Sequence, residues 1–216
     1  MSAFTLTALN SAKLNGYLGE KLALCLERRI KAEDVDGLVA PFRRREERSL
    51  WQTEFWGKWM LAAVPAYEYS GNKALYEQIR SSTQAVIATQ SADGYIGNYP
   101  DDGRLQGWDI WGRKYTLLGL MGYYDLCKDA QTLQAACRLA DLCIKELGPS
   151  AKVNIAKTGM HHGMASCSIL EPFMRLYRRT REERYLEMAR HIIACIEGPD
   201  GPQLIKKGLA GVPVAE

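Results

Sequence analysis

The segment Tyr67-Glu-Tyr-Ser-Gly-Asn-Lys-Ala-Leu-Tyr76 has two counterparts further along the chain, Tyr124-Asp-Leu-Cys-Lys-Asp-Ala-Gln-Thr-Leu133 and Tyr177-Arg-Arg-Thr-Arg-Glu-Glu-Arg-Tyr-Leu186. Their opening tyrosines are 57 and 53 residues apart. Each segment ends an amphipathic stretch on an aromatic residue, passes a short polar turn and enters another stretch, which is typical of an α-hairpin. Hairpins repeated at about 55 residues stack into a solenoid or close into a ring.

Apolar residues recur on both sides of these turns at the spacing of helix faces, and nothing requires a strand. The sequence therefore predicts an all-α fold. Ser49 with Gln52 and Thr180 with Glu183 have capping-box spacing, and Gly71 is placed to end a helix. The expected helices are 14–30, 49–69, 73–90, 109–126, 130–147, 163–179 and 182–197.

Composition excludes several classes of protein. The 216 residues are 47% hydrophobic and 25% charged with a net charge of +3, which is ordinary for a globular chain. No apolar run approaches the ~20 residues that span a bilayer, so we expect no membrane partner. Basic clusters lack a nucleic-acid-binding motif, so we expect no nucleic-acid partner.

Cysteine usage and the N-terminus bear on the compartment. The six cysteines form no CxxC pair and lie in apolar helical stretches, which predicts buried, reduced thiols and no metal site in this segment. Residues 1–13 do not resemble a secretory signal. We expect a cytoplasmic protein, or a secreted or periplasmic one if a signal was removed.

Connection lengths alternate along the predicted hairpins. The turns at 70–72, 127–129 and 180–181 are tight, whereas the connections 31–48, 91–108 and 148–162 are long. Alternate turns of a hairpin array lie at opposite ends of the helices, so the three long connections should share one end. Long loops in compact domains are usually functional. We predict the binding mouth at that end.

Residues suited to sugar binding gather in these connections and at the helix starts that follow them. All five tryptophans lie within 51–59 and 108–111, next to carboxylates and basic groups. Sugars stack on aromatic faces and need planar polar partners for their hydroxyls. Trp at helical spacing is also typical of a core, which we favour for Trp59. The predicted substrate-binding residues are Glu54, Trp56, Lys58, Asp93, Tyr95, Trp108, Asp109, Trp111, Arg113, His161 and His162.

Catalytic residues are not assigned. Adjacent His161 and His162 point in different directions, so a shared metal is not expected, and a loop-bracing role stays open for both. Glycosidases use two carboxyl groups flanking the scissile bond, but sequence alone places no two acids at that separation. No Gly-x-Ser-x-Gly elbow is present.

Several motifs resemble one family. Gln90-Ser-Ala-Asp-Gly-Tyr-Ile-Gly97, Tyr123-Tyr124, Gly159-Met-His161 and Glu183-Arg-Tyr-Leu-Glu-Met-Ala189 resemble, in the same order, the N-terminal half of the β-L-arabinofuranosidase-type glycoside hydrolases of family 127, over about residues 15–200. The resemblance implies about half of an (α/α)6 toroid with a sugar pocket at one mouth. It also implies hydrolysis of O-glycosidic bonds in plant or microbial glycans.

The resemblance has two departures. The family's His-Glu-Leu-Tyr start of the fourth helix is replaced by Trp108-Asp-Ile-Trp111, and Tyr115 replaces a later histidine, which suggests another glycoside as substrate. The family's cysteine nucleophile, acid/base glutamate and zinc ligands lie beyond the region matched. Any zinc would therefore be bound by downstream residues.

We expect residues 1–216 to form a single incomplete toroid domain, since six hairpins need roughly 330 residues. It would supply substrate-binding walls and be inactive alone, with a missing C-terminal half or a second copy as partner. Two other functions remain open. One is a non-enzymatic helical scaffold that binds a glycan or protein on its concave face. The other is a lyase, epimerase or unsaturated-uronide hydrolase on the same architecture.

Overall fold

A computed structural model describes residues 12–213, and this part of the chain is all-α, as the periodicity predicts. Prediction and structure agree to within about three residues at most helix boundaries. The elements are α1 (Gly16–Cys25), the π-helical turn η1 (Leu26–Ile30), α2 (Val35–Arg44), α3 (Thr53–Ser70), α4 (Lys73–Ile87), η2 (Asp101–Gly103), α5 (Asp109–Cys127), α6 (Ala130–Leu147), η3 (Ile155–Lys157), α7 (Met164–Cys167), α8 (Leu170–Thr180), α9 (Glu183–Glu197) and α10 (Leu204–Leu209).

The three tight turns have the same backbone conformation. Gly71, Lys128 and Arg181 each follow a helix in the left-handed conformation, with φ of 64°, 57° and 61°. The next residue begins the following helix, and Asn72 and Asp129 cap it by accepting from the amide nitrogens of Leu75 and Thr132. These caps satisfy amides that a helix start leaves unpaired. The predicted repeat of hairpins is confirmed.

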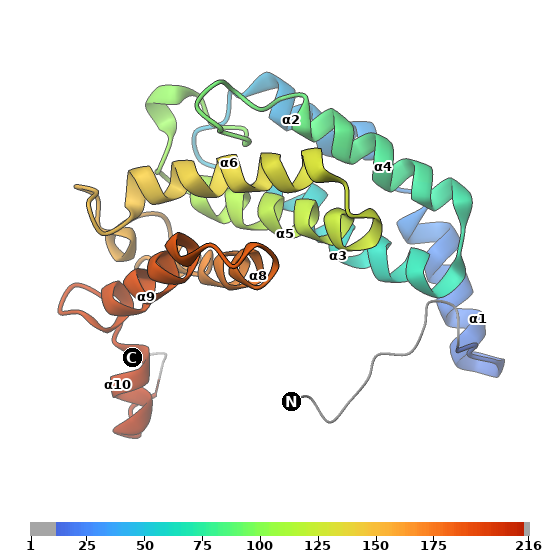
Figure 1. Cartoon of the computed structure of the whole chain (residues 1–216). Coiled ribbons are helices and arrows are strands. Elements are labelled where there is room, and N and C mark those ends of the chain that lie inside the picture. Colours follow the sequence, from blue (N-terminus) through green and yellow to red (C-terminus); the bar gives the residue numbers. More distant parts are fainter. Residues whose placement is uncertain (1–11, 214–216) are drawn as a thin grey trace.

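The hairpins form two layers of an arc. Helices α3, α5 and α8 contact one another in succession, and each packs on the partner that follows it, α4, α6 or α9. Figure 1 shows the arc, with α4 and α6 above α3 and α5 and with α8 and α9 continuing the array. Arg179 of α8 is paired with Asp125 of α5, and Arg184 of α9 lies 2.8 Å from Asp141 of α6. The arc corresponds to about half of an (α/α)6 toroid.

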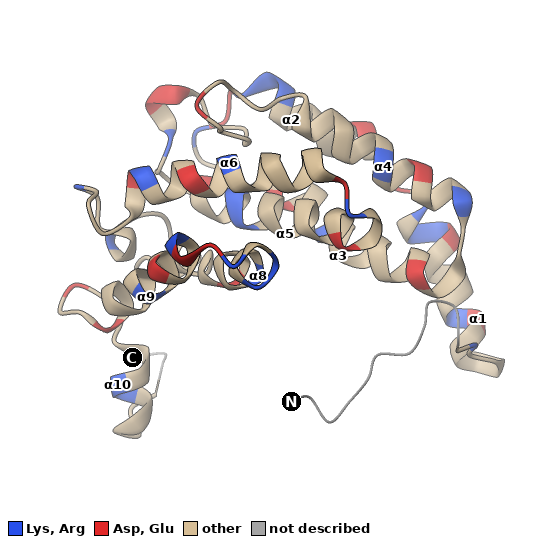
Figure 2. Cartoon of the chain, in the orientation of Figure 1, with Lys and Arg blue, Asp and Glu red and all other residues tan. Residues whose placement is uncertain are grey.

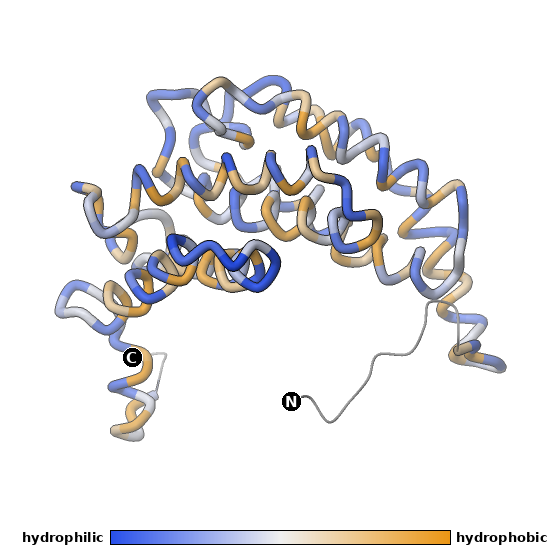
Figure 3. Tube along the Cα trace, in the orientation of Figure 1, coloured by the Kyte–Doolittle hydropathy of each residue, from blue (hydrophilic) through white to orange (hydrophobic). Residues whose placement is uncertain are grey.

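One main hydrophobic core lies between the two layers and runs the length of the arc. Hydrophobic residues recur along every hairpin helix in Figure 3, and the charged residues in Figure 2 mix both signs over the helices. Trp59 belongs to this core, as expected, and its Nε1 donates to the carbonyl oxygen of Ile30 at 2.9 Å. Along the described residues, no helix is both long and apolar enough to cross a membrane.

Some local predictions are wrong. The connection 31–48 contains α2, α10 follows the last predicted helix, and the predicted helix 163–179 is broken into α7 and α8. Neither capping box forms, because Gln52 and Glu182 occupy the N-cap positions without a side-chain bond to the helix. All six cysteines are free, but only Cys143 and Cys167 are buried and Cys25 is exposed. The signal-peptide prediction falls mainly on residues 1–11, outside the described part.

The long connections do meet at one end of the helices. The Glu47 amide donates to the Asn98 carbonyl at 3.0 Å, and Arg48 lies 2.9 Å from Asp102, so the segment after α2 packs on the 91–108 loop. The third connection joins them where the ring of His161 lies 5.4 Å from that of Trp108. In Figure 1 these loops lie at the left ends of the helices, opposite the tight turns.

Candidate functional site

Four aromatic rings form a continuous surface, here called the aromatic platform, at the end where the long connections meet. It consists of Trp51, Trp108, Trp111 and Tyr115. Neighbouring rings along this series have centroids 5.4, 5.8 and 5.1 Å apart with interplanar angles near 70°. Trp51 is 40% exposed and the other three are half-buried, so ring faces and edges remain accessible. An accessible aromatic surface with polar neighbours suits the C–H faces of a sugar.

The platform is assembled by two helix starts and one loop residue. Trp51 precedes α3, whereas Trp108, Trp111 and Tyr115 follow the helical repeat at the start of α5, so their side chains emerge on one side. His161 extends the platform because its ring packs on Trp108. The predicted roles of Trp108, Trp111 and His161 at the mouth are consistent with these positions.

Charged groups surround the platform. Glu54, in the first turn of α3, accepts from Lys58 Nζ at 2.7 Å and from Trp111 Nε1. Lys58 and Lys114 both place their ammonium groups near the rings of Trp111 and Tyr115. The Glu54 carboxylate therefore fixes the orientation of the Trp111 ring while Lys58 remains 44% exposed.

A second polar cluster, here called the buried network, lies beneath this end of the arc. It consists of Tyr95, Asp109, Arg113 and Glu146. Asp109 accepts from Tyr95 Oη at 2.7 Å, from Arg113 Nη2 at 2.6 Å and from the Leu105 amide at 2.9 Å. Arg113 also pairs with Glu146. Burial alone would lower the pKa of Arg113, but Asp109 and Glu146 outweigh it and raise that pKa further.

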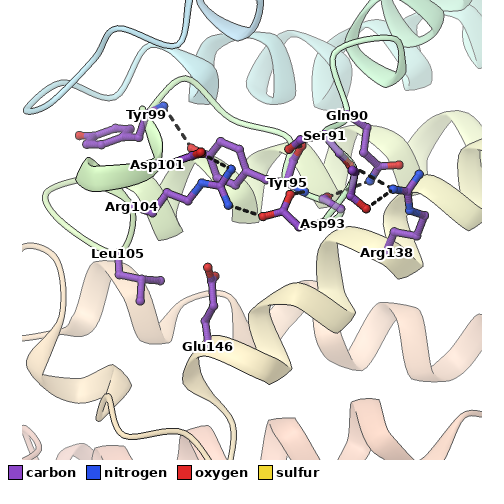
Figure 4. A network of polar contacts seen from close by, with 12 residues as sticks. Gln90, Ser91, Asp93, Tyr95, Tyr99, Asp101, Arg104, Leu105, Arg138 and Glu146 are labelled. Atoms are coloured by element: carbon purple, nitrogen blue, oxygen red, sulfur yellow. Dashed lines mark hydrogen bonds and ion pairs between the residues drawn. The ribbon is translucent and has the colours of Figure 1, made fainter.

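Tyr95 links the buried network to the surface. Its hydroxyl accepts from the Tyr99 amide at 3.1 Å, and the guanidinium carbons of Arg104 and Arg113 lie 4.0 and 4.8 Å from its ring centroid. Burial, together with Asp109, raises the pKa of Tyr95, so it stays a neutral hydrogen-bond donor. Figure 4 shows Arg104 reaching from beside this ring to Asp93 and Asp101.

The 91–95 turn is anchored on α6. Arg138 Nη2 donates to the carbonyls of Ser91 and Ala92 at 3.0 Å each. Gly94 has φ of +100°, and a Cβ there would lie 2.6 Å from the Arg138 carbonyl oxygen, so only glycine fits this approach. Partial burial would raise the pKa of Asp93, but hydrogen bonds from Arg104 and the Tyr95 amide lower it to about 2.

Four of the predicted substrate-binding residues need correction. Trp56 has no exposed surface and packs edge-on against Phe42 in the core, so it cannot stack on a sugar. Tyr95, Asp109 and Arg113 belong to the buried network, where their polar atoms already bind one another. Helix periodicity turns Trp56, Asp109 and Arg113 inward, whereas Tyr95 is buried by the packing of the loop between α4 and η2.

The side chains of the two histidines have different neighbours. His161 and His162 both adopt the left-handed conformation with φ of 55° and 53°, and Gly163 follows with 79°. His161 packs on Trp108, whereas His162 lines a cavity of about 660 Å³ together with Lys157 and Asp200. Non-glycine residues in this conformation are strained, and such strain clusters at functional sites.

Sequence reasoning missed Trp51, Lys114 and Tyr115 as members of the site. Lys114 and Tyr115 lie three and four residues after Trp111, a spacing that puts them on one helix face and was available as a signal. Trp51 joins the platform through a contact between the start of α3 and the residue before α5, which no local pattern reveals.

The sequence of this chain matches one known protein family. The family described as "Beta-L-arabinofuranosidase, GH127 catalytic domain" matches residues 12–197. The chain belongs to this family. No curated protein sequence matches it.

Solved structures from family 127 share the fold. A GH127 β-L-arabinofuranosidase from Geobacillus stearothermophilus T6 aligns over 94% of this chain with a TM-score of 0.71 and 15% identity. A second GH127 β-arabinofuranosidase aligns over 87% with a TM-score of 0.69 and 17% identity. The chain spans 35% and 33% of the length of these two proteins.

The zinc of the expected catalytic centre does not fit the described part of the chain. Within residues 12–213, no three His, Cys, Asp or Glu side chains come together as a metal site. The two cysteines in the core also lack thiolate character, because burial raises the pKa of Cys143 to about 11 and that of Cys167 to about 12. With these pKa values neither thiol acts as a nucleophile at neutral pH.

Proposed function

We propose that this family 127 chain binds the sugar of a glycoside substrate on the aromatic platform and supplies a wall of a glycoside hydrolase active site. The observation that carries the proposal is the accessible series of rings from Trp51 to Tyr115, placed where the three long connections meet. Soluble proteins usually bury such rings, and an exposed cluster rimmed by polar groups marks a binding site.

The acids beside the platform support a binding role over a catalytic one. Glu54 is occupied by Lys58 and Trp111, and Asp109 is occupied by three donors inside the buried network. A glycosidase needs one carboxyl group free to donate a proton and another free to attack or to activate water. Neither Glu54 nor Asp109 is free in this way, so in this proposal the catalytic pair lies outside the described residues.

The experiment compares two tyrosines on one helix. Tyr115→Ala removes a platform ring, whereas Tyr124→Ala removes a half-buried ring at the tight-turn end of α5, where it contacts Lys128. Binding of methyl β-L-arabinofuranoside is followed by tryptophan fluorescence, and hydrolysis is assayed with the 4-nitrophenyl β-L-arabinofuranoside. We expect the Tyr115 and Trp111→Ala variants to lose about tenfold in affinity and the Tyr124 variant to bind normally.

Saccharide binding without turnover supports the wall function. Equal binding by the Tyr115 and Tyr124 variants would place the sugar elsewhere. Binding that neither tyrosine affects, but that a protein partner blocks, would favour the helical scaffold. Turnover by the chain alone would contradict the proposal that the catalytic pair lies elsewhere.

A further inference from the structure

Two lysines flank the same pair of platform rings. Lys114 Nζ lies 4.6 Å from the centroid of Trp111 and 4.9 Å from that of Tyr115. Lys58 Nζ lies 5.9 and 5.1 Å from the same two centroids. Ammonium groups are attracted to aromatic faces, which holds both cations over these two rings, within reach of a ligand that binds there.

The two lysines differ in how their charge is compensated. Lys58 is paired with Glu54 at 2.7 Å, whereas Lys114 makes no ion pair with any residue in the described part of the chain. Glu171 is the nearest acid on α8, but it is paired with Arg175 at 2.8 Å. Burial, together with the charge of Lys58, lowers the pKa of Lys114 although the charges of Glu171 and Glu54 raise it, so these two acids only partly compensate the ammonium group.

Lys114 also borders a second space. A cavity of about 530 Å³ opens beside it, with an apolar lining that includes Met164, Leu170 and Met174. This volume lies within the range of small-molecule sites. Lys114 therefore stands between an aromatic surface and a cavity of ligand size, and both are open to solvent.

The surrounding charges keep this region positive. Arg175 and Arg178 line an adjoining hollow together with Glu171. Lys58 and Lys114 are the other two cations of this region. The four cations outnumber the two carboxylates, Glu54 and Glu171, which are paired with Lys58 and Arg175. A local excess of one sign attracts ligands of the opposite sign and raises their local concentration.

We propose that the site selects an anionic saccharide, whose ring stacks on Trp111 and Tyr115 and whose charged group binds Lys114 Nζ. The inference rests on the proposed sugar-binding function and adds the substrate class. A carboxylate of a uronic acid and a sulfate ester share the required chemistry. Charge-assisted hydrogen bonds to either are shorter and about twice as strong as neutral ones.

The test uses three methyl galactosides that differ only at C6: the neutral galactoside, the galacturonide and the 6-sulfate. Each is titrated into the full chain with tryptophan fluorescence as the readout. We expect at least one anionic probe to bind about tenfold more tightly than the neutral one, and that preference to fall as ionic strength rises from about 0.05 to about 0.5 M.

Matched variants assign the preference to one lysine. Lys114→Met should bind all three probes equally, and Lys114→Arg should retain the preference. Lys145→Met is the control, because it removes the same charge from an exposed position on α6, outside the site. Melting curves of all three variants establish that they are folded.

The outcomes separate the two proposals. A preference for the 6-sulfate that depends on Lys114 assigns a sulfated sugar, and one for the galacturonide assigns a uronide. Equal binding of neutral and anionic probes that Lys114→Met leaves unchanged overturns the anionic substrate and leaves the sugar-binding function standing. Binding of none of the galactosides, together with no binding of methyl β-L-arabinofuranoside, overturns the sugar-binding function itself.

Discussion

The buried network and the aromatic platform both take side chains from the start of α5, yet these side chains have opposite environments. Asp109 and Arg113 point into the arc, where their side chains are 1% and 0% exposed. Trp108, Trp111 and Tyr115 lie on the accessible side of the same turns. Positions four apart share a face, so helix phase alone separates the polar core from the aromatic surface.

The polar contacts of the two regions should differ in how much they contribute to stability. Inside the protein, every member of an ion-pair network depends on the others, because removing one leaves a buried charge without compensation. On the platform, Lys58 and Lys114 keep access to water, and exposed pairs contribute little. We therefore expect substitutions in the buried network to affect folding and substitutions on the platform to affect binding.

The largest expected effect comes from Arg113→Met. It leaves Asp109 buried without its counter-ion, so the free energy of unfolding should fall by about 3–5 kcal/mol in urea denaturation. The control is Arg190→Met, which breaks an exposed pair with Glu183 and should cost under about 1 kcal/mol. Equal losses of unfolding free energy in the two variants would mean that the buried pair contributes no more to stability than the exposed one.

Two tryptophans, one in the core and one on the platform, test the same difference between buried and exposed positions. Trp56 is buried and its Nε1 has no hydrogen-bond partner among the described residues, so packing alone holds it. Trp56→Ala should lower the free energy of unfolding by about 3–5 kcal/mol. Trp51→Ala removes an exposed platform ring and should cost under about 1.5 kcal/mol. A larger loss for Trp51 would show that the platform is part of the core.

A glycine sets the distance between α3 and α5. A Cβ on Gly57 would lie 2.3 Å from the Tyr115 carbonyl oxygen, so Gly57→Ala should separate the helices and cost about 1–3 kcal/mol in thermal or urea unfolding. Gly208 in α10 has open space around it, and Gly208→Ala should be neutral or stabilise by up to about 1 kcal/mol. A neutral Gly57→Ala would mean that the platform tolerates a wider helix spacing.

The smallest expected effect is a pH dependence at the edge of the buried network. Asp93 has a pKa of about 2 in the folded chain, below its ordinary 3.8, so its contribution to stability is complete above about pH 4 and is lost as the pH falls toward about 2. Because its side chain is 40% exposed, that contribution is at most about 1 kcal/mol. The difference between the wild type and Asp93→Asn in urea unfolding should shrink as the pH falls toward about 2 and vanish below it. A difference that stays constant with pH would contradict the ion pair with Arg104.

Much of the fold could be predicted from sequence because it depends on local rules. The tyrosine spacing and polar turns predicted the three hairpins, and the alternation of connection lengths predicted where the long connections meet. The same reasoning missed α2, since its apolar face depends on packing against α3 and α4. It also placed two capping boxes that do not form, because the chain enters α3 and α9 at other residues.

The candidate site was predicted less well, because the types of residue in a segment do not show which side chains face the core and which face solvent. Trp56 and Trp111 stand in similar sequence surroundings, but Trp56 is fully buried against Phe42, whereas Trp111 is half-buried and donates to Glu54. Arg113 and Lys114 are adjacent, but Arg113 is fully buried, whereas Lys114 makes no ion pair with an acid of residues 12–213. Only the packing of α5 between α3, α6 and α8 decides between them.

The left-handed residues at Gly71, Lys128 and Arg181 have an evolutionary consequence. They close each hairpin at one pole through backbone geometry, and this geometry places few demands on the side chains elsewhere. The opposite pole can then exchange loops and aromatic residues without disturbing helix register. Such a division is compatible with a fold that this chain shares with the Geobacillus enzyme at 15% identity.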